Sequence, residues 1–358
     1  MKKIVGIIGA ALLASSIFAV DFSAGVRLEG DLFNYSVSKK DGSAISALME
    51  KHNNEFYHAP IAFSISGDRA GGTLKLTDKA GDDVLSSAWS IWFKPLDMLK
   101  ITVGAHDFAI NQEHIGWCNS ETHLETTGFA CNLAIDAFNM NLILNPGNGN
   151  AFMTAKGTAD PEVAELAATF GYSADFGSVN AFFDAANTFN DYRFAAGYNA
   201  GGLLPVALWV NVIGYAGDKF EEFKAIRGEL DVAGTFGPVS NETFIAGGYN
   251  FKSMADFNGN FGGSESWHVG YIGAAEKAFV GFYTKFSMPV NGFGLYLEVK
   301  DSNVLADDFA INIKPGFTKS VGACAIDLGI SADISTKKAD ANQNKVAIGV
   351  PVSFAVNF

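Results

Sequence analysis

The chain has 358 residues, of which 38 are acidic and 25 are basic, so its formal net charge at pH 7 is −13. No stretch concentrates basic residues, and nucleic acid is therefore excluded as an expected partner. Hydrophobic residues make up 48% of the chain and include 31 Phe. They alternate with polar residues and never form the run of about 20 apolar residues that a membrane-spanning helix requires.

The first nineteen residues have the pattern of a secretory signal peptide. Residues 1–3 are basic after the initiating Met, residues 4–14 are apolar, and residues 15–19 include the small side chains that a signal peptidase needs. We predict cleavage after Ala19, which makes residues 1–19 the leader and residues 20–358 the exported protein. No linker or shift in composition interrupts residues 20–358, so they are predicted to form one domain.

Beyond the leader, apolar side chains recur at every second residue, which is the period of a β-strand with two different faces. The clearest examples lie at residues 22–29, 99–104, 206–212, 309–314 and 326–332. The most apolar stretch, Leu203 to Gly217, is interrupted by Pro205 and Asn211 and is too short for a membrane helix. The sequence therefore predicts a succession of strands.

The connections between these strands fall into two classes. Short connections with turn residues are predicted at residues 94–97, 136–139, 173–177, 234–238 and 289–292. Long polar connections are predicted at residues 39–58, 107–127, 145–161, 252–265 and 336–344. Short turns at one end and long loops at the other are typical of membrane β-barrels.

The last fourteen residues, Lys345 to Phe358, combine an apolar row with an aromatic end. The row consists of Val346, Ile348, Val350, Val352, Phe354, Val356 and Phe358, and the residues between are small or polar. This segment resembles the closing strand of a bacterial outer-membrane β-barrel, whose terminal aromatic is read by the barrel-assembly machinery. The resemblance implies that Phe354, Val356 and Phe358 form the assembly signal. It also implies outer-membrane lipids as partners and the outer membrane of a Gram-negative-type bacterium as the location.

The predicted fold is all-β, a transmembrane antiparallel up-and-down β-barrel of about 18 strands, with 16 as the alternative. An even number follows because both ends of such a barrel face the periplasm. Residues 90–100 look similar to hairpins in spirochaetal outer-membrane proteins. Pro351 departs from the pattern because it removes a ladder N–H from the last strand, so we expect it at a bulge or at the seam with the first strand.

Placing the apolar row outward leaves charged residues of both signs on the inner wall. Such charges would be costly in a sealed apolar lumen, so water is expected inside, and the mixed wall resembles that of general diffusion porins. The simpler interpretation is that many of these residues only solvate a water-filled wall and bridge neighbouring strands. The candidate pore-lining residues are Arg27, Glu29, Asp31, Lys75, Lys100, Asp184, Arg193, Arg227, Glu229, Glu298, Lys300 and Lys314.

Two functions are compatible with this wall. The first is a porin, a water-filled channel for passive diffusion of small hydrophilic solutes or ions. The second is a surface ligand-binding or adhesive barrel whose lumen is plugged by a loop. A transporter of hydrophobic compounds is disfavoured by the charged wall. The sequence does not fix the oligomeric state, and a homo-oligomer is among the expectations.

No catalytic, metal or cofactor motif is apparent, and the protein is not expected to be an enzyme. The sequence contains neither Gly-x-Ser-x-Gly nor His-Glu-x-x-His. His106, His114 and His123 are irregularly spaced in one predicted loop, so solvated loop residues are the expected interpretation.

Three cysteines lie in an exported chain. A disulfide between Cys118 and Cys131 would close the loop of residues 107–127 in an oxidising compartment, although the sequence does not show that the two approach each other. Cys324 shares its parity with Ile326 and Leu328. It is therefore expected to face lipid near the periplasmic rim as a small apolar residue.

Overall fold

The computed structural model describes residues 19–38, 42–47, 61–78, 85–109, 123–146, 164–186, 189, 191–201, 204–217, 221–252, 277–301, 303–305, 310–336 and 344–357. All secondary-structure elements of these residues are strands. Within the same ranges, no helix is long and apolar enough to cross a membrane.

Twenty strands follow one another along the chain. The first ten are β1 (Ala19–Ser38), β2 (Gly42–Ala47), β3 (Ile61–Ser66), β4 (Ala70–Asp78), β5 (Leu85–Leu96), β6 (Leu99–Ala109), β7 (His123–Ile135), β8 (Phe138–Pro146), β9 (Ala164–Ala174) and β10 (Gly177–Ala186). The others are β11 (Asp191–Asn199), β12 (Ala207–Gly217), β13 (Glu222–Phe236), β14 (Val239–Asn250), β15 (Lys277–Val290), β16 (Phe293–Asp301), β17 (Ala310–Val321), β18 (Cys324–Gly329), β19 (Ser331–Ser335) and β20 (Lys345–Asn357).

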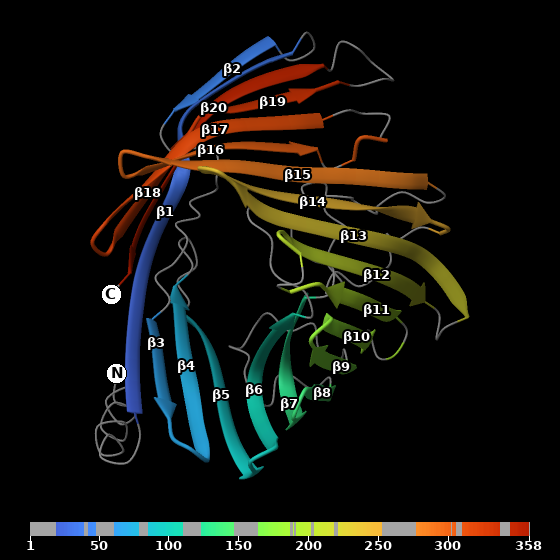
Figure 1. Cartoon of the computed structure of the whole chain (residues 1–358). Coiled ribbons are helices and arrows are strands. Elements are labelled where there is room, and N and C mark those ends of the chain that lie inside the picture. Colours follow the sequence, from blue (N-terminus) through green and yellow to red (C-terminus); the bar gives the residue numbers. More distant parts are fainter. Residues whose placement is uncertain are drawn as a thin grey trace.

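The strands form one antiparallel sheet that returns to its start, because β20 pairs with β1. Figure 1 shows β1 between β3 and the last strands. Two positions in the sheet are occupied by pairs of short strands: β2 and β3 both pair with β1, and β18 and β19 both pair with β17 and β20. Counting each interrupted strand once reduces the twenty segments to eighteen positions. The predicted up-and-down β-barrel fold is confirmed.

The two faces of the wall differ as the alternation predicts. In β12, Val210 and Val212 are 38% and 49% exposed, whereas the alternate residues Asn211 and Ile213 are buried. In β20, Val346 and Ile348 are exposed and Ala347 is buried. Within the predicted segment, Ala207 to Gly217 form a strand, β12, with an apolar outer face.

Short turns lie at one end of the barrel. Two-residue turns connect β5 to β6, β7 to β8, β9 to β10, β13 to β14, β15 to β16 and β17 to β18. In the turn after β15, Asn291 and Gly292 have φ values of 50° and 75°. Positive φ at both central residues is the requirement of the type I′ turn that best fits a twisted hairpin.

One predicted turn is displaced. Residues 94–97 were expected to form a connection, but β5 continues to Leu96 and the turn lies at Asp97 and Met98. The pairing with β6 shifts between Phe93 and Leu96, which is a β-bulge. A bulge tolerates Pro95 inside a strand because no ladder N–H is needed there.

The sheet is weakened where β18 ends and β19 begins. Ile330 donates its N–H to the Pro315 carbonyl at 2.9 Å, and Pro315 has no N–H to return. Gly329, one residue earlier, faces the opposite edge and lies across from Pro351, which also has no N–H. The carbonyls of Gly329 and Ile330 therefore each lack a ladder donor.

Pro351 lies both at the seam with the first strand and beside a bulge, the two positions expected for it. It lies at the seam, in register with Asp31 of β1, and the pairing of β1 with β20 shifts between Asp31 and Asn34. The bulge, the missing donors and the interruption between β18 and β19 thus lie side by side in the closing strands.

We expect the substitution Pro351→Val to raise the free energy of unfolding by about 0.5–1.5 kcal/mol, the usual contribution of one hydrogen bond. The new N–H would reach the Gly329 carbonyl, and a β-branched residue suits a strand. Urea unfolding of the refolded barrel measures the change. Pro238→Val, in the turn after β13, adds no ladder bond and serves as control. An unchanged or lower stability for Pro351→Val would show that the Gly329 carbonyl gains nothing from a ladder donor.

Candidate functional site

The inner face of β10 and β11 carries a buried ion pair. Asp184 and Arg193 lie in register, with Arg193 Nη2 at 3.4 Å from Asp184 Oδ2 and both side chains 1% exposed. The guanidinium also lies 4.7 Å from the centre of the Phe182 ring. Arg193 is thus held by a carboxylate and an aromatic face, and it does not meet open water.

A second buried cluster joins β12 and β13. Glu229 accepts a hydrogen bond from Arg227 Nε at 3.0 Å and another from Asn211 Nδ2 at 3.1 Å. Asn211 and Glu229 are register partners, so the second bond crosses between strands. Both carboxylate oxygens of Glu229 therefore have a donor.

These two clusters change the physical account of the inner wall. Charged residues at these positions were expected to be solvated by water. Instead, Asp184, Arg193 and Arg227 are at most 1% exposed and Glu229 is 5% exposed. Burial of charges is tolerable when partners with good geometry replace water. The Asp184–Arg193 pair bridges neighbouring strands, as the simpler interpretation included, whereas Arg227 and Glu229 pair within β13.

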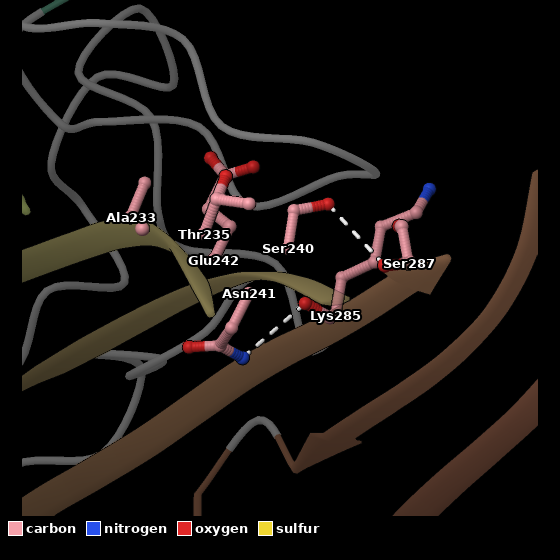
Figure 2. A pocket seen from close by; sticks show the side chains of 8 residues that line it. Ala233, Thr235, Ser240, Asn241, Glu242, Lys285 and Ser287 are labelled. Carbon is pink, nitrogen blue, oxygen red and sulfur yellow. Dashed lines mark hydrogen bonds between the residues drawn. The ribbon is translucent and has the colours of Figure 1, made fainter. Parts of the chain in front are cut away.

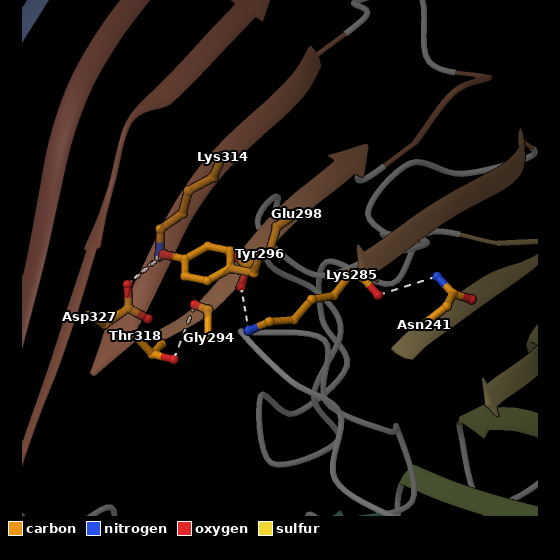
Figure 3. A network of polar contacts seen from close by, with 8 residues as sticks. All are labelled: Asn241, Lys285, Gly294, Tyr296, Glu298, Lys314, Thr318 and Asp327. Carbon is orange, nitrogen blue, oxygen red and sulfur yellow. Dashed lines mark hydrogen bonds and ion pairs between the residues drawn. The ribbon is translucent and has the colours of Figure 1, made fainter. Parts of the chain in front are cut away.

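Four consecutive strands carry a ladder of alternating charge. Glu242 of β14 is in register with Lys285 of β15, Lys285 with Glu298 of β16, and Glu298 with Lys314 of β17. Lys285 Nζ lies 2.8 Å from Glu298 Oε1, and Lys314 Nζ lies 3.8 Å from Asp327 Oδ1 of β18 (Figure 3). Each cation has a carboxylate beside it, so the ladder neutralises itself.

Tyr296 connects the two lysines of this ladder. Lys285 Nζ and Lys314 Nζ lie 4.7 Å and 5.3 Å from the centre of its ring, and its hydroxyl donates to Asp327 (Figure 3). Glycines make the room: a Cβ on Gly316 would lie 2.4 Å from the ring, and a Cβ on Gly329 would lie 2.8 Å from Lys314 Cε. The ring is therefore fixed by its neighbours on several sides.

Uncharged polar side chains link β7, β8 and β9. Asn132 Nδ2 donates to Asn139 Oδ1 and to Asn141 Oδ1, each at 2.8 Å. Asn141 Nδ2 donates in turn to Thr169 Oγ1 at 2.8 Å. This chain of amides and a hydroxyl links three strands across the inner face.

Two lysines near the short-turn end of β5 and β6 lie against one aromatic ring. Lys100 Nζ and Lys94 Nζ are 5.0 Å and 5.8 Å from the centre of the Trp92 ring. Trp92 shares its face of the wall with Thr102, its register partner. Among the described residues, neither lysine is within ion-pair distance of a carboxylate, in contrast to Arg193, Arg227, Lys285 and Lys314.

A cavity of about 350 Å³ lies against the short-turn ends of β13, β14 and β15 (Figure 2). Its lining is formed by Ala233, Gly234, Thr235, Ser240, Asn241, Glu242, Lys285 and Ser287. Ser240 Oγ donates to the Ser287 carbonyl at 3.4 Å. The cavity thus includes two members of the charge ladder and three hydroxyl groups.

Seven of the twelve predicted pore-lining residues lie in the buried clusters, in the cation–aromatic contact or in the charge ladder. Asp184, Arg193, Arg227 and Glu229 lie in the buried clusters, and Lys100, Glu298 and Lys314 lie in the cation–aromatic pair and the ladder. Lys300 is the register partner of Tyr283 and Asn312. Arg27, Glu29 and Asp31 pair with Ala355, Ser353 and Pro351, and Lys75 with Ala62 and Ala88; the side chains of these four lie outside the described residues.

Several residues of the wall were missed. Tyr296, Trp92 and Asp327 carry contacts to the lysines but were not predicted as site residues. Tyr296 has the same parity as Glu298 in one strand, and this parity was a usable signal.

The sequence also raised the questions of a disulfide between Cys118 and Cys131, of the position of Cys324, and of a metal site. Cys131 is in register with Ile101 and Leu142, inside β7, and it forms no disulfide with another described residue. Cys118 lies outside the described residues, so its pairing with Cys131 stays a prediction. Cys324 is a free thiol in register with Val321 and Val356, beside a short turn. The described part of the chain brings no three His, Cys, Asp or Glu together as metal ligands.

No protein-family description and no curated protein sequence matches the chain. Solved structures do match it over nearly its whole length. OpdO of Pseudomonas aeruginosa has a TM-score of 0.56 at 11% identity, covering 96% of this chain and 99% of that one. The outer membrane protein OpdK from Pseudomonas aeruginosa has 0.53 at 7%, covering 94% and 99%. OccAB3 of Acinetobacter baumannii has 0.53 at 10%, covering 95% and 99%. At these identities the likeness is one of fold, and the chain shares the barrel fold of these proteins from end to end.

Proposed function

We propose that the protein is a porin, an outer-membrane channel for passive diffusion of small hydrophilic solutes or ions. The observation that carries this proposal is the sheet of eighteen strand positions that closes on itself with apolar residues outside and polar residues inside. A barrel of about 16 to 18 strands is wide enough for an aqueous channel. The apolar outer rows of β12 and β20 suit contact with lipid.

The proposed location follows from both ends of the chain and from the fold. Residues 1–19 are proposed to be the leader that directs export. Because β1 runs from Ala19 to Ser38, cleavage after Ala19 would leave the strand from Val20 onward. Phe354 and Val356 lie on the outer row of β20, before the terminal Phe358. We therefore propose outer-membrane lipids and the barrel-assembly machinery as partners, and the likeness to the outer membrane protein OpdK supports this location.

The choice between ions is proposed to depend on unpaired cations. The ladder and the buried clusters neutralise their own charges, whereas Lys94 and Lys100 beside Trp92 have no carboxylate partner among the described residues. These two lysines are therefore proposed to raise the local concentration of anions.

We expect the double substitution Lys94→Gln with Lys100→Gln to shift the reversal potential toward cation selectivity in a salt gradient. The double substitution Lys285→Gln with Glu298→Gln removes a neutral pair, so it should leave the reversal potential unchanged. Equal shifts in both variants, or no shift in the first, would contradict this role for the two lysines.

A surface ligand-binding barrel with a plugged lumen is the second candidate. It is favoured by one observation, the burial of the inward side chains on β10 to β13, where Asp184 and Arg193 are 0% exposed. This burial shows that part of the inner wall is not lined by open water.

Osmotic swelling of liposomes distinguishes the two functions. Vesicles that contain the refolded protein are diluted into solutions of uncharged solutes of increasing size. A porin produces swelling at rates that fall with solute size, whereas a plugged barrel produces no swelling although the protein is folded by heat-modifiability on gels.

A further inference from the structure

The cavity at the short-turn ends of β13, β14 and β15 has the size and position of a solute-binding site (Figure 2). Its volume of about 350 Å³ is near the lower end of the ~300–1,000 Å³ range of small-molecule sites. Thr235 and Ser240 flank the turn between β13 and β14, so the cavity lies near the predicted periplasmic exit.

Hydroxyl groups dominate the polar chemistry of this cavity. Thr235, Ser240 and Ser287 each offer a hydroxyl that both donates and accepts. Within the described structure, the hydroxyls of Thr235 and Ser287 have no hydrogen-bond partner, and that of Ser240 makes one long bond of 3.4 Å. A ligand that carries hydroxyls of its own could engage all three in either direction.

The one cation of the cavity lining is already paired. Lys285 Nζ lies 2.8 Å from Glu298 Oε1, and Glu242 is the register partner of Lys285 on β14. An anionic ligand would have to compete with Glu298 for Lys285, a cationic ligand would have to compete with Lys285 for the carboxylates, and either would lose its hydration. A neutral ligand can still use the carboxylate of Glu242 as a hydrogen-bond acceptor.

We infer that this cavity is a subsite for a neutral polyhydroxylated solute of monosaccharide size. The inference rests on the proposed channel function and gives that channel a substrate class. Its residues are Thr235, Ser240, Glu242, Lys285 and Ser287. Binding at the exit would slow the passage of such a solute in a saturable way, whereas a featureless pore would pass it in proportion to its concentration.

Binding is measured by saturation-transfer NMR on the folded protein in detergent micelles, which does not require conduction. The probes are D-glucose, D-gluconate and D-glucosamine, which have similar size but different charge. Glucose should bind more tightly than the two charged analogues. The double substitution Thr235→Val with Ser287→Ala should weaken glucose binding at least about ten-fold, because it removes two hydrogen-bonding hydroxyls.

The matched control is Thr102→Val with Ser90→Ala, which removes the same groups from the wall of β5 and β6 and should leave glucose binding unchanged. Tighter binding of gluconate or glucosamine, equal weakening in both double variants, or no glucose binding to the wild-type protein would overturn the inference. A silent barrel that still binds glucose as expected would instead refute the channel and leave the subsite standing.

Discussion

Replacing Arg193 with Met is expected to lower the free energy of unfolding by about 3–5 kcal/mol. The substitution removes the guanidinium that lies 3.4 Å from Asp184 and leaves that carboxylate in a site where it is 0% exposed. A buried carboxylate that loses the guanidinium beside it gains no water in exchange, so the expected cost is large. Urea unfolding of the barrel refolded in detergent measures it.

Two further variants serve as comparisons for Arg193→Met. The double substitution Asp184→Leu with Arg193→Met should recover most of the loss, because no charge then remains in the pair. Arg69→Met breaks an ion pair of 2.9 Å whose side chains are 59% and 91% exposed, and it should cost at most about 1 kcal/mol. A similar small cost for Arg193→Met would contradict the burial of the Asp184–Arg193 pair.

Replacing Val212 with Lys is expected to cost about 2–4 kcal/mol, the effect of a cation near the bilayer midplane on the lipid face of a barrel. Val212 is 49% exposed in the middle of β12, on the apolar row. Refolding into lipid vesicles, followed by urea titration, gives the change in stability.

The last strand provides a matched pair at one depth. Val352→Lys places the cation on the outer row, whereas Ser353→Lys places it on the inner row beside Asp327, the register partner of Ser353. The first should be as costly as Val212→Lys and the second should be tolerated. Equal damage by both substitutions would contradict a wall with one lipid-facing and one inner face.

The strands and their faces could be predicted from the sequence because successive side chains of a strand point to opposite faces, so a wall with one apolar and one polar face has a period of two. Val346 to Val356 alternate with small or polar residues, and the structure pairs this strand with β1 and exposes Val346 and Ile348. The interruptions could not be predicted in the same way. The break between β18 and β19 depends on Pro315 and Pro351 facing adjacent residues of the same strand, which requires the register of three strands.

The charge ladder was predictable only in part. The Asn291–Gly292 turn is a two-residue hairpin signal, and counting back from it pairs Lys285 with Glu298. Glu242 and Lys285 are in register across a connection of more than twenty residues, and no turn rule fixes that register. Parity likewise tells which face a side chain takes, as for Arg193, but it does not tell whether water or protein covers that face.

A conducting aqueous path through the barrel is tested most directly by single-channel recording of the refolded protein in planar bilayers. A barrel of eighteen strand positions with a polar inner wall predicts discrete current steps on the order of hundreds of picosiemens or more in concentrated salt. Protein that is folded by heat-modifiability, inserts into the bilayer and remains electrically silent would contradict the channel.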